Sequence, residues 1–137
     1  MTSGSTAFDL AGTFILIDEG PTATPIAVGP DLWERLQKSP IANSPSGRLI
    51  SLGDQRADWG HWEMHPASDE VLILLSGSLE LILEENGQER SVLLNSLSAF
   101  IVRRGTWHRA RVHAPGKLLG ITGGAGTQHK PIARPQS

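Results

Sequence analysis

The sequence predicts an all-β domain made of two facing antiparallel sheets, with one short helix near the N-terminus. Between Arg48 and Ile121, short apolar runs alternate with Gly, Pro, Asn and Ser at a spacing of roughly 8–12 residues, as a sandwich or barrel requires. Ser76-Gly77-Ser78 and Glu85-Asn86-Gly87 have the residues of tight hairpin turns, because Gly and Asn-Gly accept a positive φ. The 15 Gly and 9 Pro of the 137 residues also break the chain too often for long helices.

The segment before residue 48 is expected to hold two strands and the helix. Thr13–Ile17 is rich in β-branched residues and precedes the turn signal Asp18-Glu19-Gly20-Pro21, after which Pro25–Val28 forms a second strand. Asp31 is expected to cap about two turns of helix that end before Pro40. The helix carries its apolar residues at positions i, i+1 and i+4: Leu32, Trp33 and Leu36.

Further short strands complete one domain. Their expected ranges are Arg48–Leu52, Trp59–His65, Val71–Leu75, Leu79–Glu84, Arg90–Leu94, Ala99–Arg103, Trp107–His113 and Leu118–Ile121. This gives a single barrel domain over residues 11–122, preceded by a loose arm at residues 1–10 and followed by a Gly-rich tail at residues 123–137. Two interpretations of the tail stay open: a solvated end, or a segment that closes over the barrel and brings His129 to a site.

Composition excludes several classes of function. The net charge of −2 gives the chain as a whole no electrostatic hold on nucleic acid or an anionic membrane. The absence of Cys excludes a disulfide framework and a thiolate nucleophile, so any metal site must use His and carboxylates. No apolar run reaches the roughly 18 residues needed to span a bilayer, and the N-terminal residues lack a signal-peptide pattern. We therefore expect a cytoplasmic protein without nucleic-acid or membrane partners.

Several polar residues occur where strand patterning predicts an interior face. Alternate residues of a strand share a face, so one side of the strand at 59–65 carries Trp59, His61, Glu63 and His65. Glu70 opens an apolar strand, and His108 shares its face with Ala110 and Val112. Because an unpaired buried charge is costly, these side chains need a metal ion or a hydrogen-bonded cluster such as Glu70 with His108. The residues alone leave both interpretations open.

The spacing of these residues resembles the motifs of the cupin superfamily. The first cupin motif resembles the segment from Glu63 to Gly77, in which Glu63-x-His65 is followed after four residues by Glu70 and after six more by Gly77. Glu63 occupies a position that usually holds His. Gly105-Thr106-Trp107-His108, preceded by a strand at 99–103, resembles the second motif. The resemblance spans about residues 49–121 and implies a small single-domain cupin, a jelly-roll β-barrel with metal ligands pointing into its cavity.

The resemblance also implies a ligand set and leaves some roles open. The expected ligands of a divalent transition metal (iron, manganese, zinc or nickel) are Glu63, His65, Glu70 and His108. Glu63 is either the fourth ligand or a carboxylate that holds a His in one tautomer. His61 is expected at the pocket mouth, where it could also replace or supplement a ligand. Trp59 is a candidate for the substrate wall, with core packing as the alternative.

These features predict a small-molecule cupin, but they leave its activity open. A metal-dependent enzyme is the leading interpretation, and a dioxygenase-like reaction is favoured over isomerase or lyase chemistry. The alternative is a non-catalytic small-ligand binding or sensing module, which fits a barrel without an attached DNA-binding helix pair. A homodimer is also expected, because Trp62, Met64 and Trp107 alternate away from the ligand face and need a cover.

Overall fold

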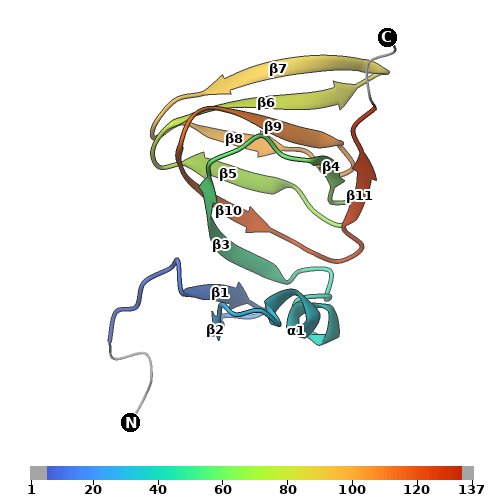
Figure 1. The fold of residues 1–137 in the computed structure, drawn as a ribbon. Helices are drawn as coiled ribbons and strands as arrows, with labels where there is room; N and C mark the ends of the chain where they lie inside the picture. The colour runs from blue at the N-terminus through green and yellow to red at the C-terminus, as the bar shows by residue number, and fades with distance from the viewer. Residues whose placement is uncertain (1–5, 134–137) are drawn as a thin grey trace.

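The computed structural model describes residues 6–133, which form two antiparallel sheets and one short helix (Figure 1). The larger sheet has the spatial order β2 (Ala23–Ala27), β1 (Thr13–Ile17), β3 (Arg48–Gln55), β10 (Gly116–Thr122), β5 (Glu70–Leu74) and β8 (Ala99–Val102). The smaller sheet has the order β11 (Gln128–Pro131), β4 (His61–Met64), β9 (His108–Ala114), β6 (Ser78–Glu85) and β7 (Gln88–Leu94). The predicted all-β jelly-roll class is confirmed.

The main core lies between the two sheets and consists largely of leucines. The cluster contains Leu72, Leu74, Leu79, Leu81, Leu83, Leu94, Val102, Ala110 and Leu118. Along β5, buried and half-buried residues alternate, so Glu70 lies on the same buried face as Leu72 and Leu74. The apolar strand therefore carries one carboxylate into the barrel interior, as the sequence predicts.

One of the two predicted hairpin turns is present, between β6 and β7. The other, at Ser76-Gly77-Ser78, is a tight turn but not a hairpin, because β5 and β6 lie in different sheets and do not pair. β6 and β7 are joined through Asn86 and Gly87, whose φ angles of 53° and 76° are those of a two-residue hairpin loop. Gly77, at the β5–β6 turn, has a φ of 90°, and a Cβ atom there would lie 2.6 Å from the carbonyl oxygen of Ala114. A side chain at position 77 would therefore strain the turn and collide with the backbone.

Helix α1 (Leu32–Lys38) packs beside the barrel through a second, smaller core. Leu32 and Leu36 are buried against Phe14 of β1, because residues i and i+4 share one face of a helix. The predicted helix is present, and Trp33 lies outside that core and is 65% exposed. Asp31 occupies the N-cap position without a capping hydrogen bond from its side chain, which pairs with Arg35 at 3.2 Å instead.

The segment that we expected to be a tail contributes a strand. After β10 the chain turns through residues 123–127, and β11 then pairs antiparallel with β4, so that His129 lies opposite Glu63 (Figure 1). At the other end, residues 6–10 form no strand and lead into a turn at Asp9. The remainder of the predicted arm and tail, residues 1–5 and 134–137, lies outside the described residues.

The apolar residues behind the dimer prediction are covered by the chain itself. Trp62 is only 4% exposed. The guanidinium of Arg109 lies 4.9 Å and the ammonium of Lys130 5.5 Å from its ring, and Lys130 also lies 4.6 Å from the ring of Trp107. The homodimer and the cytoplasmic location stay predictions. Within residues 6–133, no helix has the length and apolar character needed to cross a bilayer.

Candidate metal centre

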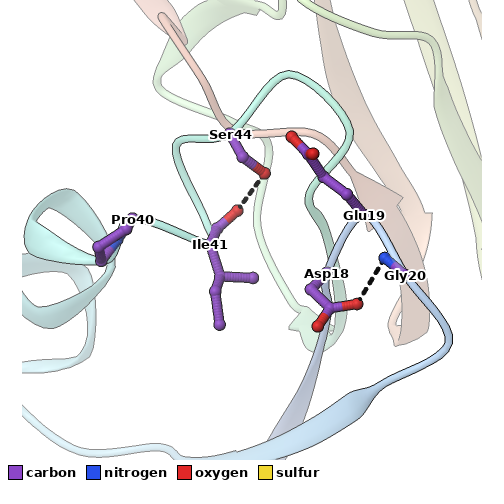
Figure 2. Close-up of a pocket in the computed structure, with 6 residues that line it drawn as sticks. All are labelled: Asp18, Glu19, Gly20, Pro40, Ile41 and Ser44. Carbon is purple, nitrogen blue, oxygen red and sulfur yellow. Dashed lines mark hydrogen bonds between the residues drawn. The ribbon is translucent and has the colours of Figure 1, made fainter.

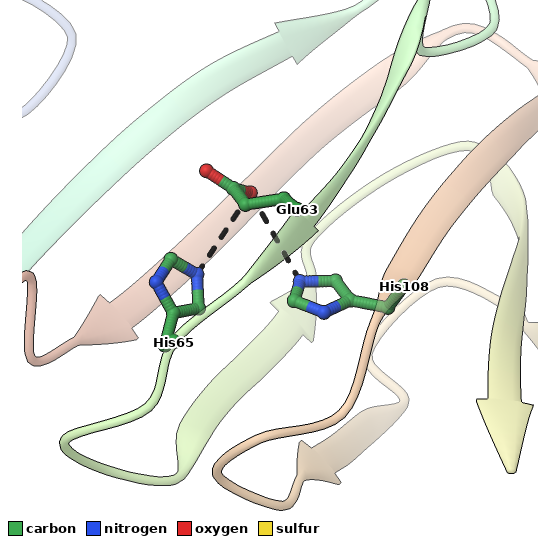
Figure 3. A group of neighbouring side chains, drawn as sticks. All are labelled: Glu63, His65 and His108. Carbon is green, nitrogen blue, oxygen red and sulfur yellow. Dashed lines mark ion pairs between the residues drawn. The ribbon is translucent and has the colours of Figure 1, made fainter. Parts of the chain in front are cut away.

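The two histidines and two carboxylates singled out in the sequence come together inside the barrel. Glu63 lies on β4 and pairs in register with His108 at the start of β9. His65 follows β4 directly, and Glu70 begins β5 after the intervening turn. Figure 3 shows that His65 and His108 both present their rings to the carboxylate of Glu63.

The distances in this cluster match those between ligands of one ion. Nε2 of His65 lies 3.3 Å from Oε2 of Glu70, and Nε2 of His108 lies 3.0 Å from Oε1 of Glu70. Oε2 of Glu63 lies 3.8 Å from Nε2 of His65 and 3.9 Å from Nε2 of His108. Ligands at about 2.1 Å from one ion stand about 3.0 Å apart in octahedral and about 3.4 Å apart in tetrahedral geometry. The cluster therefore has the spacing of ligands to one divalent ion, and one ligand atom each of Glu63, His65 and His108 lie within 4.8 Å of one another.

Three donor atoms of the cluster are buried without a hydrogen bond in the described chain. They are Nε2 of His65, Nε2 of His108 and Oε1 of Glu70. Nε2 of His108 and Oε1 of Glu70 lie 3.0 Å apart, close enough to share one proton or one ion. Buried polar atoms normally have a partner, so this arrangement points to a missing common partner such as a metal ion.

The second ring nitrogen of each histidine is held by a hydrogen bond that fixes the tautomer. Nδ1 of His108 lies 3.0 Å from the carbonyl oxygen of Thr106, which can only accept, so Nδ1 carries the proton. Nδ1 of His65 lies 2.9 Å from the hydroxyl oxygen of Thr127. That hydroxyl donates to the carbonyl of Gly124 at 3.0 Å and therefore accepts from His65. Both Nε2 lone pairs are left free for an ion.

Glu70 is held in its ionised form although it is buried. Burial raises its pKa, but the neighbouring His108 and His65 more than offset this and lower the pKa to about 2. The hydroxyl of Thr122 also donates to Oε2 at 2.5 Å. For His108, burial lowers the pKa, and the contact with Glu70 outweighs it, so the pKa is raised. The raised pKa favours the protonated imidazole of His108, so a proton and a metal ion would compete for its Nε2.

The loops that carry the ligands are tied to each other. Asp69, next to Glu70, accepts hydrogen bonds from the backbone N–H of Arg104 at 2.9 Å and from the Arg103 side chain at 3.1 Å. The backbone N–H of Gly105 donates to the carbonyl of His65 at 2.9 Å. The β4–β5 and β8–β9 connections thus move together, which fixes His65 and Glu70 relative to His108.

A cavity of about 780 Å³ leads from helix α1 to the cluster. Trp59, His61, Glu63, His65 and Glu70 all line it, and Trp59 also packs against the main core. The indole N–H of Trp59 donates to the side chain of Gln55 at 2.8 Å. His61 is exposed and its ring lies 4.8 Å from that of His129, whose Nε2 is 3.4 Å from Oε1 of Glu63.

A second, shallower pocket lies away from this cluster. It has a volume of about 300 Å³ and is lined by Asp18, Glu19, Gly20, Pro40, Ile41 and Ser44 (Figure 2). Its hydrogen bonds are local ones that shape the two loops: the backbone N–H of Gly20 donates to Asp18, and the hydroxyl of Ser44 donates to the carbonyl of Ile41. These contacts stabilise the two turns, and none of the histidines of the cluster lines this pocket.

Sequence reasoning did not find the residues that orient the ligands. Thr122 and Thr127 are isolated hydroxyl residues in or beside strands, and no spacing rule marks them. Thr106 acts through its backbone carbonyl, which any residue would supply. His129 was expected near the site only in one interpretation of the tail, and the pairing of β11 with β4 places it there.

Comparisons with known proteins identify the fold. No family model and no curated protein matches the chain. Among solved structures, a hydroquinone 1,2-dioxygenase in complex with Cd²⁺ and 4-hydroxybenzonitrile is similar with a TM-score of 0.50 and 16% identity, over 55% of this chain and 56% of that chain. A cupin-2 domain containing protein from Shewanella frigidimarina has a TM-score of 0.49 and 18% identity, over 56% of this chain and 70% of that chain. The chain has the cupin fold.

A third similar structure extends the comparison. The hydroxypropylphosphonic acid epoxidase from S. wedmorenis matches the cupin barrel with a TM-score of 0.48 and 16% identity, over 55% of this chain and 43% of that chain. The matched part is thus less than two thirds of both named enzymes. At these identities the similarity concerns the fold, and the chemistry of this cupin must be argued from its own residues.

Proposed function

We propose that this cupin is a metal-dependent enzyme that acts on a small organic molecule. The proposed ligands of one divalent ion are His65, His108, Glu70 and Glu63. The observation that carries the proposal is a group of buried ligand atoms without a hydrogen bond. Nε2 of His65 and Oε1 of Glu70 belong to residues that line the cavity, and Nε2 of the fully buried His108 lies 3.0 Å from Oε1 of Glu70. Two imidazole and two carboxylate donors suit iron(II), manganese, zinc or nickel.

The chain's own residues divide the work at such a site. Thr127 and Thr106 hold the two imidazoles so that Nε2 faces the cavity. Glu70 and Glu63 supply two negative charges, which balance a divalent ion and leave the centre neutral. The bound ion would supply Lewis acidity at a substrate oxygen. The cavity receives the substrate on the side of Trp59 and His61.

We favour a dioxygenase-like reaction, in which both atoms of O₂ enter the substrate and no external reductant is consumed. Among the described residues that line the cavity there is no Lys, Cys or Tyr. The cavity therefore has no amine or thiol for covalent catalysis and no phenol for proton transfer. The alternative, a non-catalytic binding or sensing module, would use the same metal and cavity. Oxygen uptake by the iron-loaded protein with a bound small molecule separates the two.

Metal content of protein purified without added metal tests the proposal. We expect about one equivalent of a divalent ion in the wild type and in His113→Ala, and almost none in His65→Ala and His108→Ala. His113 is the matched control, because it lies on the same strand as His108 but pairs with Glu80 on the surface. Equal metal content in all four proteins would overturn the proposed site.

A further inference from the structure

The wall of the cavity away from the metal ligands is apolar or neutral. Its apolar residues include Leu16, Leu36, Leu49, Leu72 and Leu118. Its uncharged polar residues are Gln37, Asn43, Ser51 and Gln55, whereas Thr122 and Thr127 line the cavity beside Glu70 and His65. Within the described chain, no Lys or Arg lines this space. The wall can therefore bury apolar surface and accept a few hydrogen bonds, but it offers no cation to a ligand.

The charge balance of the cavity disfavours an anionic ligand. Glu63 and Glu70 line it, and a divalent ion would bring their total charge to zero. A carboxylate or phosphate placed there would add negative charge to a centre whose two glutamates already balance the ion, and no Lys or Arg among the described lining residues would offset that charge. An uncharged ligand that presents a hydroxyl or carbonyl oxygen to the ion avoids both penalties.

Two indole rings give the cavity flat apolar surface. Trp33 lines it from helix α1 although 65% of this residue is exposed, while its helical neighbours Leu32 and Leu36 are buried. Trp59 lines it next to the metal ligands, with its ring 6.0 Å from that of His108. The N–H of Trp59 is already bonded to Gln55, so its ring contributes apolar contact. A large exposed aromatic residue at a cavity mouth is typical of a ligand-binding position.

We propose that the cavity binds an uncharged, flat aromatic compound and that Trp33 is a specificity-determining residue that packs on its ring. Contact between an oxygen substituent of the ring and the ion rests on the proposed function, because it requires the metal. Packing between the ring and Trp33 does not depend on the ion. The two parts can therefore be tested separately.

Three probes of one bicyclic skeleton test the inference: 2-naphthol, the anion 2-naphthoate and the saturated 2-decalol. Binding is measured calorimetrically with zinc-loaded and with metal-free protein. We expect zinc-loaded protein to bind 2-naphthol about tenfold more tightly than 2-naphthoate, and both forms to bind 2-naphthol about fivefold more tightly than 2-decalol. Absence of 2-naphthol binding at millimolar concentration, or tighter binding of 2-naphthoate, would overturn the inference.

Variants of Trp33 complete the test. We expect Trp33→Ala to weaken 2-naphthol binding about fivefold and Trp33→Phe to stay within about twofold of wild type. Phe8→Ala is the control, because Phe8 is also an exposed aromatic residue but does not line the cavity. Unchanged binding in Trp33→Ala would refute the role of Trp33. If the protein takes up no zinc, the proposed function fails, and the metal-free comparison of 2-naphthol with 2-decalol still decides the ring preference.

Discussion

His65 and His108 each use one ring nitrogen to fix their orientation and leave the other free. The hydroxyl of Thr127 and the carbonyl of Thr106 hold the Nδ1 atoms. A hydrogen bond to the second nitrogen of a metal-binding histidine determines the orientation of the ring and its tautomer. Loss of such a bond typically weakens metal affinity by about 10- to 100-fold. We therefore expect the metal affinity of this protein to depend on residues that do not touch the ion.

Thr127→Val tests this dependence with little change in side-chain shape. The valine cannot accept the hydrogen bond from His65, so the ring is free to turn. We expect zinc affinity, measured by competition with a chelator, to fall by at least about tenfold while the fold is retained. Thr24→Val, on the exposed edge strand β2, serves as the control. A Thr127→Val protein with wild-type zinc affinity would show that the contact has no positioning role.

The pair of Glu70 and His108 predicts a stability optimum for the metal-free protein. Glu70 has a pKa lowered from 4.5 to about 2, so its contribution is present above pH 4.5 and is lost as the pH falls toward 2. His108 has a pKa raised above 6.5, so its contribution is present below pH 6.5 and is lost as the pH rises through the raised pKa. These two groups together favour the folded state most between pH 4.5 and 6.5.

Melting temperatures of chelator-treated protein between pH 3 and pH 9 check this prediction. We expect the highest value between pH 4.5 and 6.5, and a flatter profile in Glu70→Gln, which lacks the charge that raises the pKa of His108. Zinc should remove the loss of stability at higher pH, because the ion replaces the proton on the imidazole. A maximum above pH 8 in metal-free wild type would contradict the proposed pairing.

At the scale of elements, two connections that are distant in sequence hold the ligands together. The β4–β5 connection carries His65 and leads into Glu70, and the β8–β9 connection leads into His108. Asp69 links them through its hydrogen bonds to Arg103 and Arg104. The link is exposed, so we expect it to matter more for the spacing of the ligands than for global stability.

Asp69→Ala removes both hydrogen bonds between these connections. We expect zinc affinity to fall several-fold, because the two loops no longer hold the imidazoles at one spacing, and the melting temperature to change little. Asp54→Ala is the matched control, since Asp54 is an equally exposed carboxylate that pairs with Lys117 on β3 and β10. Equal zinc affinity in the two variants would refute a role for Asp69 at the site.

Strand β11 is predicted to be part of the site. A chain ending at Thr122 lacks Thr127 and His129, whereas a chain ending at Pro131 keeps the whole strand and its pairing with β4. We expect the shorter protein to lose most of its zinc affinity and the longer one to keep it, as measured by the same chelator competition. Retention of full affinity by the shorter chain would show that this segment is dispensable.

The strands that could be predicted from the sequence are those whose own residues show an alternating or continuous apolar pattern. The alternation along residues 59–65 correctly placed Glu63 and His65 toward the interior, and the apolar strand after Glu70 correctly placed that carboxylate in the core. β11 has no such signal, because Gln128–Pro131 is polar and becomes a strand through pairing with β4. The exposure of Trp33 could not be predicted, because an exposed aromatic residue beside buried leucines has the same local pattern as a core residue.

At the scale of the whole molecule, the barrel joins a polar cluster to an apolar cavity. One side of the interior is filled with leucines, and the other side keeps a cavity of about 780 Å³ between α1 and the four candidate ligands. The cluster alone is compatible with a structural role, and the cavity alone with simple ligand binding. Their combination supports a centre at which a small molecule meets a metal ion.

A crystal structure of the zinc-loaded protein, with anomalous diffraction data at the zinc edge, tests the central claim most directly. The account predicts one strong anomalous peak within about 2.0–2.3 Å of Nε2 of His65, Nε2 of His108 and a carboxylate oxygen of Glu70. Nδ1 of His108 should remain bonded to the Thr106 carbonyl. A peak at surface residues such as His113 and Glu80, or no peak with His108 hydrogen-bonded directly to Glu70, would contradict the metal centre.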